Sequence, residues 1–170
     1  MAVFPAALNY ILNYEEPQRK YDITADNRGQ VCAGVNSLAQ PAAFAKIAAL
    51  NQEQRPAAVA DFYHNYFWNL LGLDSVQSQD VANRVMDMAV NAGPVTAIKL
   101  LQQAVNSFAN IRIATDGGMG PITIAAVNAA DTLKMLAAYR QQRSAYYEDI
   151  TERNPADVAY LKGWLIRAQT

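Results

Sequence analysis

The sequence predicts an all-α fold with room for one small hairpin in residues 17–36. Apolar residues recur at helical spacing along most of the chain, and proline or glycine separates the successive periodic stretches. Only residues 17–36 lack this period. The 170 residues are 52% hydrophobic and 17% charged, so the chain can bury a core and suits one domain or one domain with a small appendage.

The first helix is expected over residues 4–15. Phe4, Leu8 and Leu12 fall on one apolar stripe at helical spacing. Pro17 ends this helix, because the residue before a proline avoids the helical region. The segment that follows is rich in Asp, Asn and Gly, as is typical of a loop.

Two helices are expected before residue 73. The first begins at Pro41 and runs to about Leu50. Asn51 and Gln54 form a capping-box pattern at the start of the second, because each side chain can bond the backbone N–H of the other. Gly72 is expected to end it.

Five more helices are expected in the second half of the chain. Their boundaries are marked by residues that cap or break helices. They begin at Ser78 or Gln79, Pro94, Pro121, Asp131 and Asn154, with Gly93 and the turn TDGGMGP at residues 115–121 between them. The total is about eight helices.

The composition excludes several classes of protein. A net charge of −1 argues against nucleic-acid binding and against a polybasic membrane-surface protein, since both need a basic face. The single cysteine, Cys32, allows no internal disulfide, and the single histidine, His64, is expected to pack among aromatic residues. No apolar run reaches the ~20 residues of a membrane span. The first residues lack a positively charged leader, so we expect no signal peptide and synthesis in the cytoplasm.

Among the residues that could do chemistry, Glu15 breaks a local rule. It lies at the C-terminal end of the first helix, where the macrodipole disfavours a negative charge. The helix end, Pro17 and partial burial all favour the neutral, proton-carrying form of its carboxyl, which a general acid requires. The alternative is a simple ion pair of Glu15 with Arg19 or Lys20.

Asp26, eleven residues further on, is the candidate for a second carboxylate. In a hydrolytic pair it would activate water or act as a nucleophile, depending on the gap between the two groups. In the context ADNRGQ it is also typical of a turn residue.

Asp87 and Asn91 form a further candidate pair. They are four residues apart on one expected helix, so they share a face. These two polar side chains either line a groove or lie on a solvent-exposed edge of the helix.

In this order, the residues resemble the glycoside hydrolase family 108 muramidases, a group that includes phage endolysins. LNYEEP is similar to the end of the family's first helix and places its catalytic glutamate on Glu15. DNRGQVCAGVN resembles the family segment that begins at Asp26. YHNYFW, VMDMAVNAGPVTAIKLLQQAV, DGGMGPITIAAVN and a Gly-Trp-x-x-Arg end at residues 163–167 follow in the family's order, so the resemblance covers nearly the whole chain.

The resemblance implies a lysozyme-like catalytic part in residues 1–92 and a helical, peptidoglycan-binding-like part in residues 93–170, packed as one compact unit. It implies cleavage of peptidoglycan between N-acetylmuramic acid and N-acetylglucosamine, with Glu15 as general acid and Asp26 as second carboxylate, and with no metal or cofactor. Retaining and inverting cleavage both stay open. The expected substrate-binding residues are Gln30, Asn36, Tyr66, Trp68, Asp87 and Asn91.

Three positions depart from the family pattern. Arg28 replaces a glycine, Val31 a threonine and Ala33 an aromatic residue. In related phage lysozymes the threonine hydroxyl helps to position water, so this role moves to Gln30 or Asn36, or is lost. If it is lost, the alternatives are a catalytically inactive wall-binding protein or a structural protein of a virion or secretion machine.

The expected partner is peptidoglycan at the bacterial cell wall or in the periplasm. Without a signal peptide, the chain would reach the wall through a holin or a secretion channel. This route fits a phage endolysin or a hydrolase that assists secretion.

Overall fold

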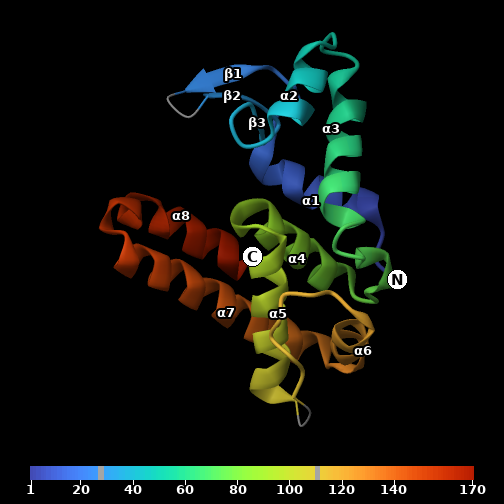
Figure 1. Cartoon of the computed structure of the whole chain (residues 1–170), viewed down its shortest axis with the longest axis vertical. Coiled ribbons are helices and arrows are strands. Elements are labelled where there is room, and N and C mark those ends of the chain that lie inside the picture. The colour runs from blue at the N-terminus through green and yellow to red at the C-terminus, as the bar shows by residue number, and fades with distance from the viewer. Residues whose placement is uncertain (27–28, 110–111) are drawn as a thin grey trace.

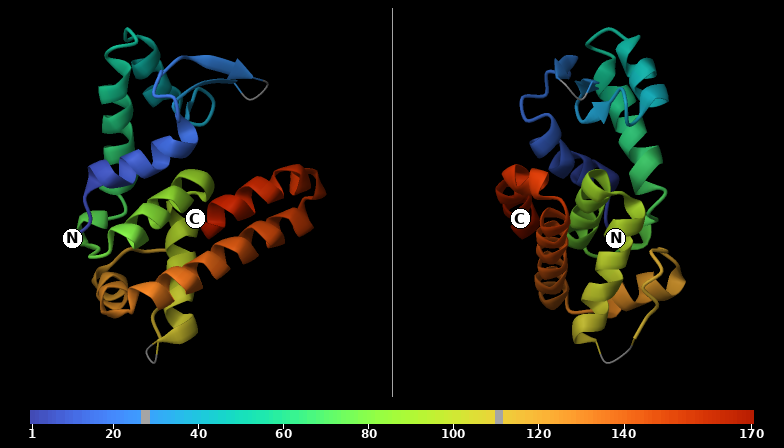
Figure 2. Two further views of the ribbon diagram at one scale, coloured as in Figure 1. Left: turned by 180° about the vertical axis from the view of Figure 1, so that it is seen from behind. Right: turned by 60° about the vertical axis from the view of Figure 1, so that its left-hand side comes forward.

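The computed structural model describes residues 1–26, 29–109 and 112–170, apart from the side chain of Asp26. Within this part, eight α-helices and one small antiparallel sheet form the molecule, so the mostly helical fold is confirmed. The sheet, α2 and α3 form one lobe, and α4 to α8 form the other (Figure 1). Helix α1 runs along the junction of the two lobes (Figures 1 and 2).

The first lobe contains the small hairpin that was considered possible in residues 17–36, and a third short strand extends it. The strands β1 and β2 pair with Thr24 opposite Val31, and β2 and β3 pair with Val31 opposite Asn36. The elements of this part of the chain are α1 (Phe4–Glu15), β1 (Thr24–Asp26), β2 (Gly29–Cys32), β3 (Val35–Asn36), α2 (Pro41–Ala48) and α3 (Arg55–Tyr63).

Helix α1 ends at Glu15, as predicted, and a single arginine covers its C-terminal end. The guanidinium of Arg19 donates to the backbone oxygens of Leu12 and Glu16. It also donates to the side-chain oxygens of Asn9, at 2.9 Å, and Asn13, at 2.8 Å. A cation at this place satisfies free carbonyl groups and offsets the negative end of the helix dipole. Arg19 therefore holds the backbone in the turn directly after Glu15.

The segment around α3 has the expected reciprocal bonds, but Asn51 does not cap the helix: α3 begins at Arg55, after the turn that holds these bonds. Asn51 and Gln54 bond each other's backbone N–H, at 3.1 and 3.4 Å, as the capping-box pattern predicts. Helix α3 then ends at Tyr63 and continues as a π-helical turn, His64–Trp68, followed by a 3₁₀ turn, Leu73–Ser75. Gly72 lies between them at a φ of 58°, which a glycine adopts without strain.

The second lobe is built around α4. Every residue from Val81 to Ala89 is buried, and α4 packs against α1, α5 and α7. Gly93 and Pro94 separate α4 from α5, and Asp131 caps α7, both as predicted. Helices α7 and α8 lie side by side and antiparallel (Figures 1 and 2). The elements are α4 (Gln79–Ala92), α5 (Pro94–Phe108), α6 (Pro121–Ala129), α7 (Thr132–Arg153), a 3₁₀ turn (Pro155–Asp157) and α8 (Val158–Gln169).

A buried glutamine organises the turn at residues 115–121. Gln102 is 1% exposed, and its amide nitrogen donates to Asp116 at 2.8 Å and to the carbonyl of Gly118 at 3.0 Å. Its amide oxygen accepts from the backbone N–H of Gly117 at 2.9 Å. The hydrogen bond from Gln102 lowers the pKa of the Asp116 carboxyl. The turn is thus fastened to α5 rather than projecting freely.

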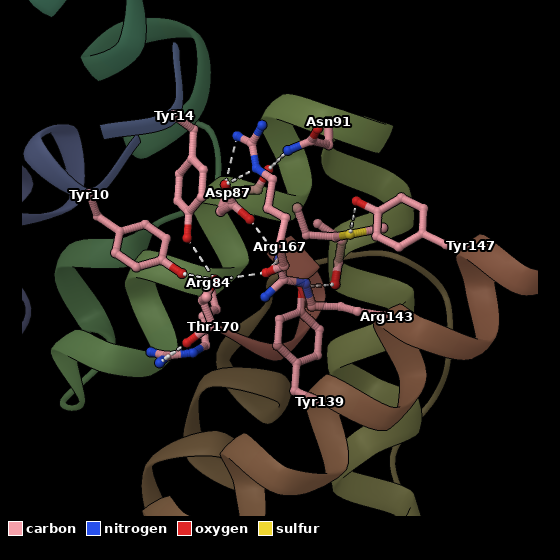
Figure 3. A network of polar contacts seen from close by, with 12 residues as sticks. Tyr10, Tyr14, Arg84, Asp87, Asn91, Tyr139, Arg143, Tyr147, Arg167 and Thr170 are labelled. Atoms are coloured by element: carbon pink, nitrogen blue, oxygen red, sulfur yellow. Dashed lines mark hydrogen bonds and ion pairs between the residues drawn. The ribbon is translucent and has the colours of Figure 1, made fainter. Parts of the chain in front are cut away.

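A buried ion-pair network joins α4 to α7 and α8 (Figure 3). The side chain of Asp87 on α4 is fully enclosed, and so is that of Arg143 on α7, whose Nη2 donates to Asp87 at 2.6 Å. Arg167 on α8 donates to the other carboxylate oxygen of Asp87 at 2.8 Å. A buried carboxylate is tolerated only when charge and hydrogen bonds compensate the lost water. Asp87 therefore fixes the α7–α8 pair against the core of the second lobe.

Replacement of Asp87 by alanine is expected to lower the free energy of unfolding by about 3–5 kcal/mol, because Arg143 would remain buried without its counter-charge. Urea unfolding followed by circular dichroism measures this. The matched control is Asp149→Ala, which removes the exposed pair with Arg153 on α7, where the side chains are 45% and 74% exposed. That change is expected to lower the free energy by at most about 1 kcal/mol. Equal effects of the two substitutions would contradict the structural role of Asp87.

Candidate active site

Glu15 is the last residue of α1, and a cation from the far end of the chain holds its side chain. The side chain is 22% exposed, and Nη2 of Arg167 donates to Glu15 Oε1 at 2.8 Å. The alternative that Glu15 pairs with Arg19 or Lys20 is replaced by this ion pair with Arg167, since the Arg19 guanidinium bonds the backbone oxygens at the helix end instead. Arg167 is the partner that the sequence analysis missed, since 152 residues separate the two.

Glu15 lines a polar cavity of about 330 Å³ between the end of α1 and the sheet. Two further carboxylates, Glu16 and Asp22, lie in its wall. Gln52 donates to Asp22 at 2.8 Å, which orients that side chain. The complete lining is Glu15, Glu16, Pro17, Gln18, Lys20, Asp22, Thr24, Val31, Ala33 and Gly34. The cavity therefore combines a partly buried acid with open polar walls.

Gly34 brings the chain close to the carboxyl of Glu15. A Cβ atom added at Gly34 would lie 2.9 Å from Glu15 Oε2 and 2.5 Å from the hydroxyl of Tyr63, and φ is +80°. Tyr63 is 1% exposed and donates to the carbonyl of Ala33 at 2.9 Å. Burial, and then the charge of Glu15, raise the pKa of the Tyr63 hydroxyl. Only glycine leaves space for both side chains, so Oε2 of Glu15 faces this backbone segment while Oε1 faces Arg167.

The strand next to Val31 carries a threonine. Thr24 lies directly opposite Val31 in the β1–β2 pair, and both residues line the Glu15 cavity. Residues directly opposite each other in an antiparallel pair point to the same face, so the Thr24 hydroxyl lies beside the valine. Gln30 is exposed and, as the neighbour of Val31 in β2, points to the other face. Of these residues, Thr24 is the one that brings a hydroxyl to the cavity.

Asn36, the other residue expected to replace the threonine, has a local structural role. Its Oδ1 accepts from the backbone N–H groups of Leu38, at 2.8 Å, and Ala39, at 3.1 Å. These bonds shape the turn that leads from β3 into α2. Thr24 was missed because it becomes relevant only through the strand register.

Asp26 is the last residue of β1, and its backbone is paired with Gly29. Its side chain lies outside the part of the chain that the structure describes. The role of second carboxylate thus stays a prediction for Asp26. Asp22, which the sequence analysis did not select, is a carboxylate that the structure places in the same cavity as Glu15.

Trp68 and Asp87 are enclosed in the core. Both are 0% exposed; Trp68 donates from Nε1 to Asp74 at 2.8 Å, and Asp87 is held by two arginines. Their placement does not support a contact with a glycan. Asn91 is exposed on α4, and its amide nitrogen donates to the backbone oxygen of Asp87 at 2.9 Å (Figure 3). Of the polar pair on this helix, Asn91 alone is open to a ligand.

Tyr66 lies in a second and larger cavity of about 640 Å³ between α2 and α3. Its side chain is 53% exposed and stacks on Phe62 with ring centroids 5.3 Å apart. Apolar residues form much of its wall, and four residues with polar side chains also line it: Gln40, Lys46, Asp61 and Asn65. Glu15 does not line this larger cavity. We therefore assign the candidate active site to the smaller cavity, which Glu15 does line.

The described residues contain no group of three or more His, Cys, Asp or Glu side chains arranged to hold a metal ion. In the same part of the chain, no helix combines the length and the apolar character that crossing a bilayer requires.

A mostly helical fold with one small sheet beside a helix that ends in a glutamate is consistent with the lysozyme-like class of fold. Residues 8–93 match the family model of glycosyl hydrolase 108, and residues 96–169 match that of a predicted peptidoglycan domain. The chain therefore belongs to the glycosyl hydrolase 108 family, and its class is that of a glycoside hydrolase acting on peptidoglycan.

The fold has a relative among the solved structures. The structure of Brucella abortus SagA is similar with a TM-score of 0.67 and 22% sequence identity, over 97% of this chain and 92% of that one. This likeness shows that the chain shares the fold of that structure over nearly its whole length. No curated protein matches the chain.

Replacement of Gly34 by alanine is expected to abolish most hydrolytic activity, because the new methyl group would displace the Glu15 carboxyl and the Tyr63 hydroxyl. The strained φ is expected to lower the free energy of unfolding by about 1–3 kcal/mol. Gly72→Ala is the matched control, since Gly72 also has a positive φ but open space around it. Activity on purified sacculi and urea unfolding are measured for both variants. Full activity of Gly34→Ala would show that the close approach is unimportant.

Proposed function

We propose that this chain is a muramidase that hydrolyses the bond between N-acetylmuramic acid and N-acetylglucosamine, with Glu15 as general acid. The observation that carries the proposal is the placement of Glu15, partly buried at a helix end and open to a polar cavity, inside the segment that matches the hydrolase family. The expected action is at the bacterial cell wall, which the match to a peptidoglycan domain supports.

In the proposed mechanism, Glu15 gives its proton to the glycosidic oxygen as the bond lengthens, and the sugar develops oxocarbenium character. The proton is carried on Oε2, because Oε1 accepts a hydrogen bond from Arg167. When the proton leaves, Glu15 becomes negatively charged beside this guanidinium. An interaction that is stronger after proton transfer than before it lowers the barrier rather than only tightening binding.

Asp26 is proposed as the second carboxylate, which stabilises the developing positive charge or guides the attacking water. The resemblance of DNRGQVCAGVN to the family segment supports this assignment. The location of Asp22 in the wall of the Glu15 cavity makes it the competing candidate. The Thr24 hydroxyl is proposed to help hold the water, in the place that Val31 leaves apolar.

Glycan contacts outside the reacting bond are proposed for Gln30, Asn36, Asn91 and Tyr66. Tyr66 and Asn91 have exposed side chains that suit a sugar ring and an acetamido group. A phage endolysin or a secretion-assisting hydrolase, with a holin or a secretion channel as its route to the wall, remains the proposed context.

Glu15→Gln is expected to lower the rate of muropeptide release from purified sacculi by about 10²–10⁴-fold, because the amide cannot donate the proton. Mass spectrometry of the digests, with reducing-end quantification, measures the rate and identifies the bond. Glu152→Gln, an exposed carboxylate on α7, is the matched control and is expected to keep full activity. If neither the native chain nor the variant released muropeptides, while both bound sacculi, the inactive wall-binding alternative would replace the proposal.

Asp26→Asn is expected to reduce the same rate by about 100-fold or more, whereas Asp22→Asn is expected to change it less than about threefold. Both substitutions keep the shape of the side chain and remove its charge, so the comparison isolates the carboxylate. The opposite result would move the role of second carboxylate to Asp22. Polarimetry or NMR of the first-formed sugar anomer on the active chain then distinguishes retaining from inverting cleavage.

A further inference from the structure

Arg167 connects the segment after residue 93 to the candidate acid. It lies on α8, and its side chain is 15% exposed. Its Nη2 donates to Glu15 at 2.8 Å, and its Nε donates to Asp87 at 2.8 Å. Its Cζ atom lies 4.6 Å from the centroid of the Tyr14 ring, so the guanidinium stacks on the residue that precedes Glu15. Figure 3 shows this arginine between Tyr14 and Asp87.

The position of Arg167 is set by the core and not by Glu15. Asp87, which fixes one edge of the guanidinium, is fully enclosed and is itself held by the fully enclosed Arg143. Arg143 also donates to the backbone oxygen of Arg167 at 3.1 Å. A planar guanidinium held along one edge presents its remaining N–H groups in a fixed direction. Arg167 is therefore a rigid donor aimed at the end of α1.

The Glu15 side chain, in contrast, can rotate unless a partner holds its carboxyl. Its side chain is partly exposed, and among the residues described Arg167 is the donor to its oxygens. A glutamate has three rotatable bonds, and an unanchored one samples several rotamers. Proton transfer requires the donor oxygen within hydrogen-bond reach of the leaving oxygen.

We propose that Arg167 is a positioning residue for the reaction: it anchors Oε1 of Glu15 so that Oε2 faces Gly34 and the cavity, and it stabilises the carboxylate that proton donation leaves. This inference rests on the proposed role of Glu15 as general acid. It makes α8 part of the catalytic unit, although α8 lies in the segment that matches a peptidoglycan domain. The enzyme is then incomplete without its C-terminal helices, because one of them supplies the anchor of the acid.

A purely structural role of Arg167, as the second partner of Asp87, is the competing explanation. It predicts lower stability without a specific loss of turnover in the folded protein. The positioning role predicts a lower kcat at nearly unchanged KM, because the substrate still binds while the acid is misplaced.

The test uses the full chain with Arg167→Gln, which keeps an N–H donor near Asp87 but removes the cation beside Glu15. Initial rates are measured on soluble peptidoglycan fragments under conditions where thermal unfolding shows the variant to be folded. The expected result is a kcat lower by about 100-fold with KM within about threefold, the loss typical of a misplaced reacting group. Arg153→Ala, which removes an exposed arginine on α7, is the matched control and is expected to keep the native kcat.

Arg167→Ala adds a second readout that a structural role would not produce. Methylguanidinium at millimolar concentration is expected to raise the rate of this variant at least about tenfold, because it can occupy the vacated place beside Glu15. It is expected to restore nothing in Glu15→Gln. If the alanine and glutamine variants do not fold, Arg167→Lys decides: its single ammonium cannot reproduce the planar fork that spans Asp87 and Glu15, and its kcat is expected to be at least about tenfold lower.

The outcomes distinguish the role of Arg167 from that of Glu15. A folded Arg167→Gln variant, or a folded Arg167→Lys variant, with the kcat of the Arg153→Ala control would overturn the positioning role while leaving Glu15 as the acid. A Glu15→Gln variant with the native rate would overturn the proposed function itself. Absence of rescue by methylguanidinium, together with a loss of rate that follows the loss of folded protein, would assign Arg167 to stability alone.

Discussion

The enclosed carboxylate of Asp87 is the constraint on which the rest of the structure depends. A negative charge in the core is tolerated only with full compensation, and here two arginines from different helices provide it. Because both must reach the same carboxylate, α7 and α8 have one position relative to α4. Through Arg167 the same constraint extends to the end of α1, so the geometry of the candidate acid is tied to the packing of the second lobe.

Two arginines bind different groups at the end of α1. Arg19 covers the free backbone carbonyls and offsets the helix dipole, and Arg167 takes the Glu15 side chain. This division leaves the carboxyl with one anchored oxygen and one oxygen near Gly34. Because Arg19 offsets the helix dipole, the guanidinium of Arg167 is left to fix the direction of the Glu15 carboxyl through its hydrogen bond to Oε1.

The first lobe carries two surfaces of different character. The cavity at Glu15 is polar, with three carboxylates and the Thr24 hydroxyl in its wall, whereas the larger cavity between α2 and α3 offers the stacked rings of Phe62 and Tyr66. The chain turn from Gly34 through Asn36 to Ala39 links the two, and Asn36 shapes that turn with its side chain. A long polymer such as a glycan can contact both surfaces, while the proposed acid lines only the smaller one.

The sequence by itself determined what depends on neighbours within a few residues: the end of α1 before Pro17, the reciprocal bonds of Asn51 and Gln54, the break at Gly93 and Pro94, and the cap at Asp131. It also selected Glu15 as the candidate acid, because a glutamate at a helix C-terminus conflicts with a local rule, and the helix does end at this residue. Only the tertiary structure decided that Glu15 is held by Arg167, that Asp87 and Trp68 are enclosed rather than open to substrate, and that Thr24 lies opposite Val31. These features depend on strand register and on the packing of segments up to 152 residues apart, and neither spacing nor composition encodes which distant side chains will meet.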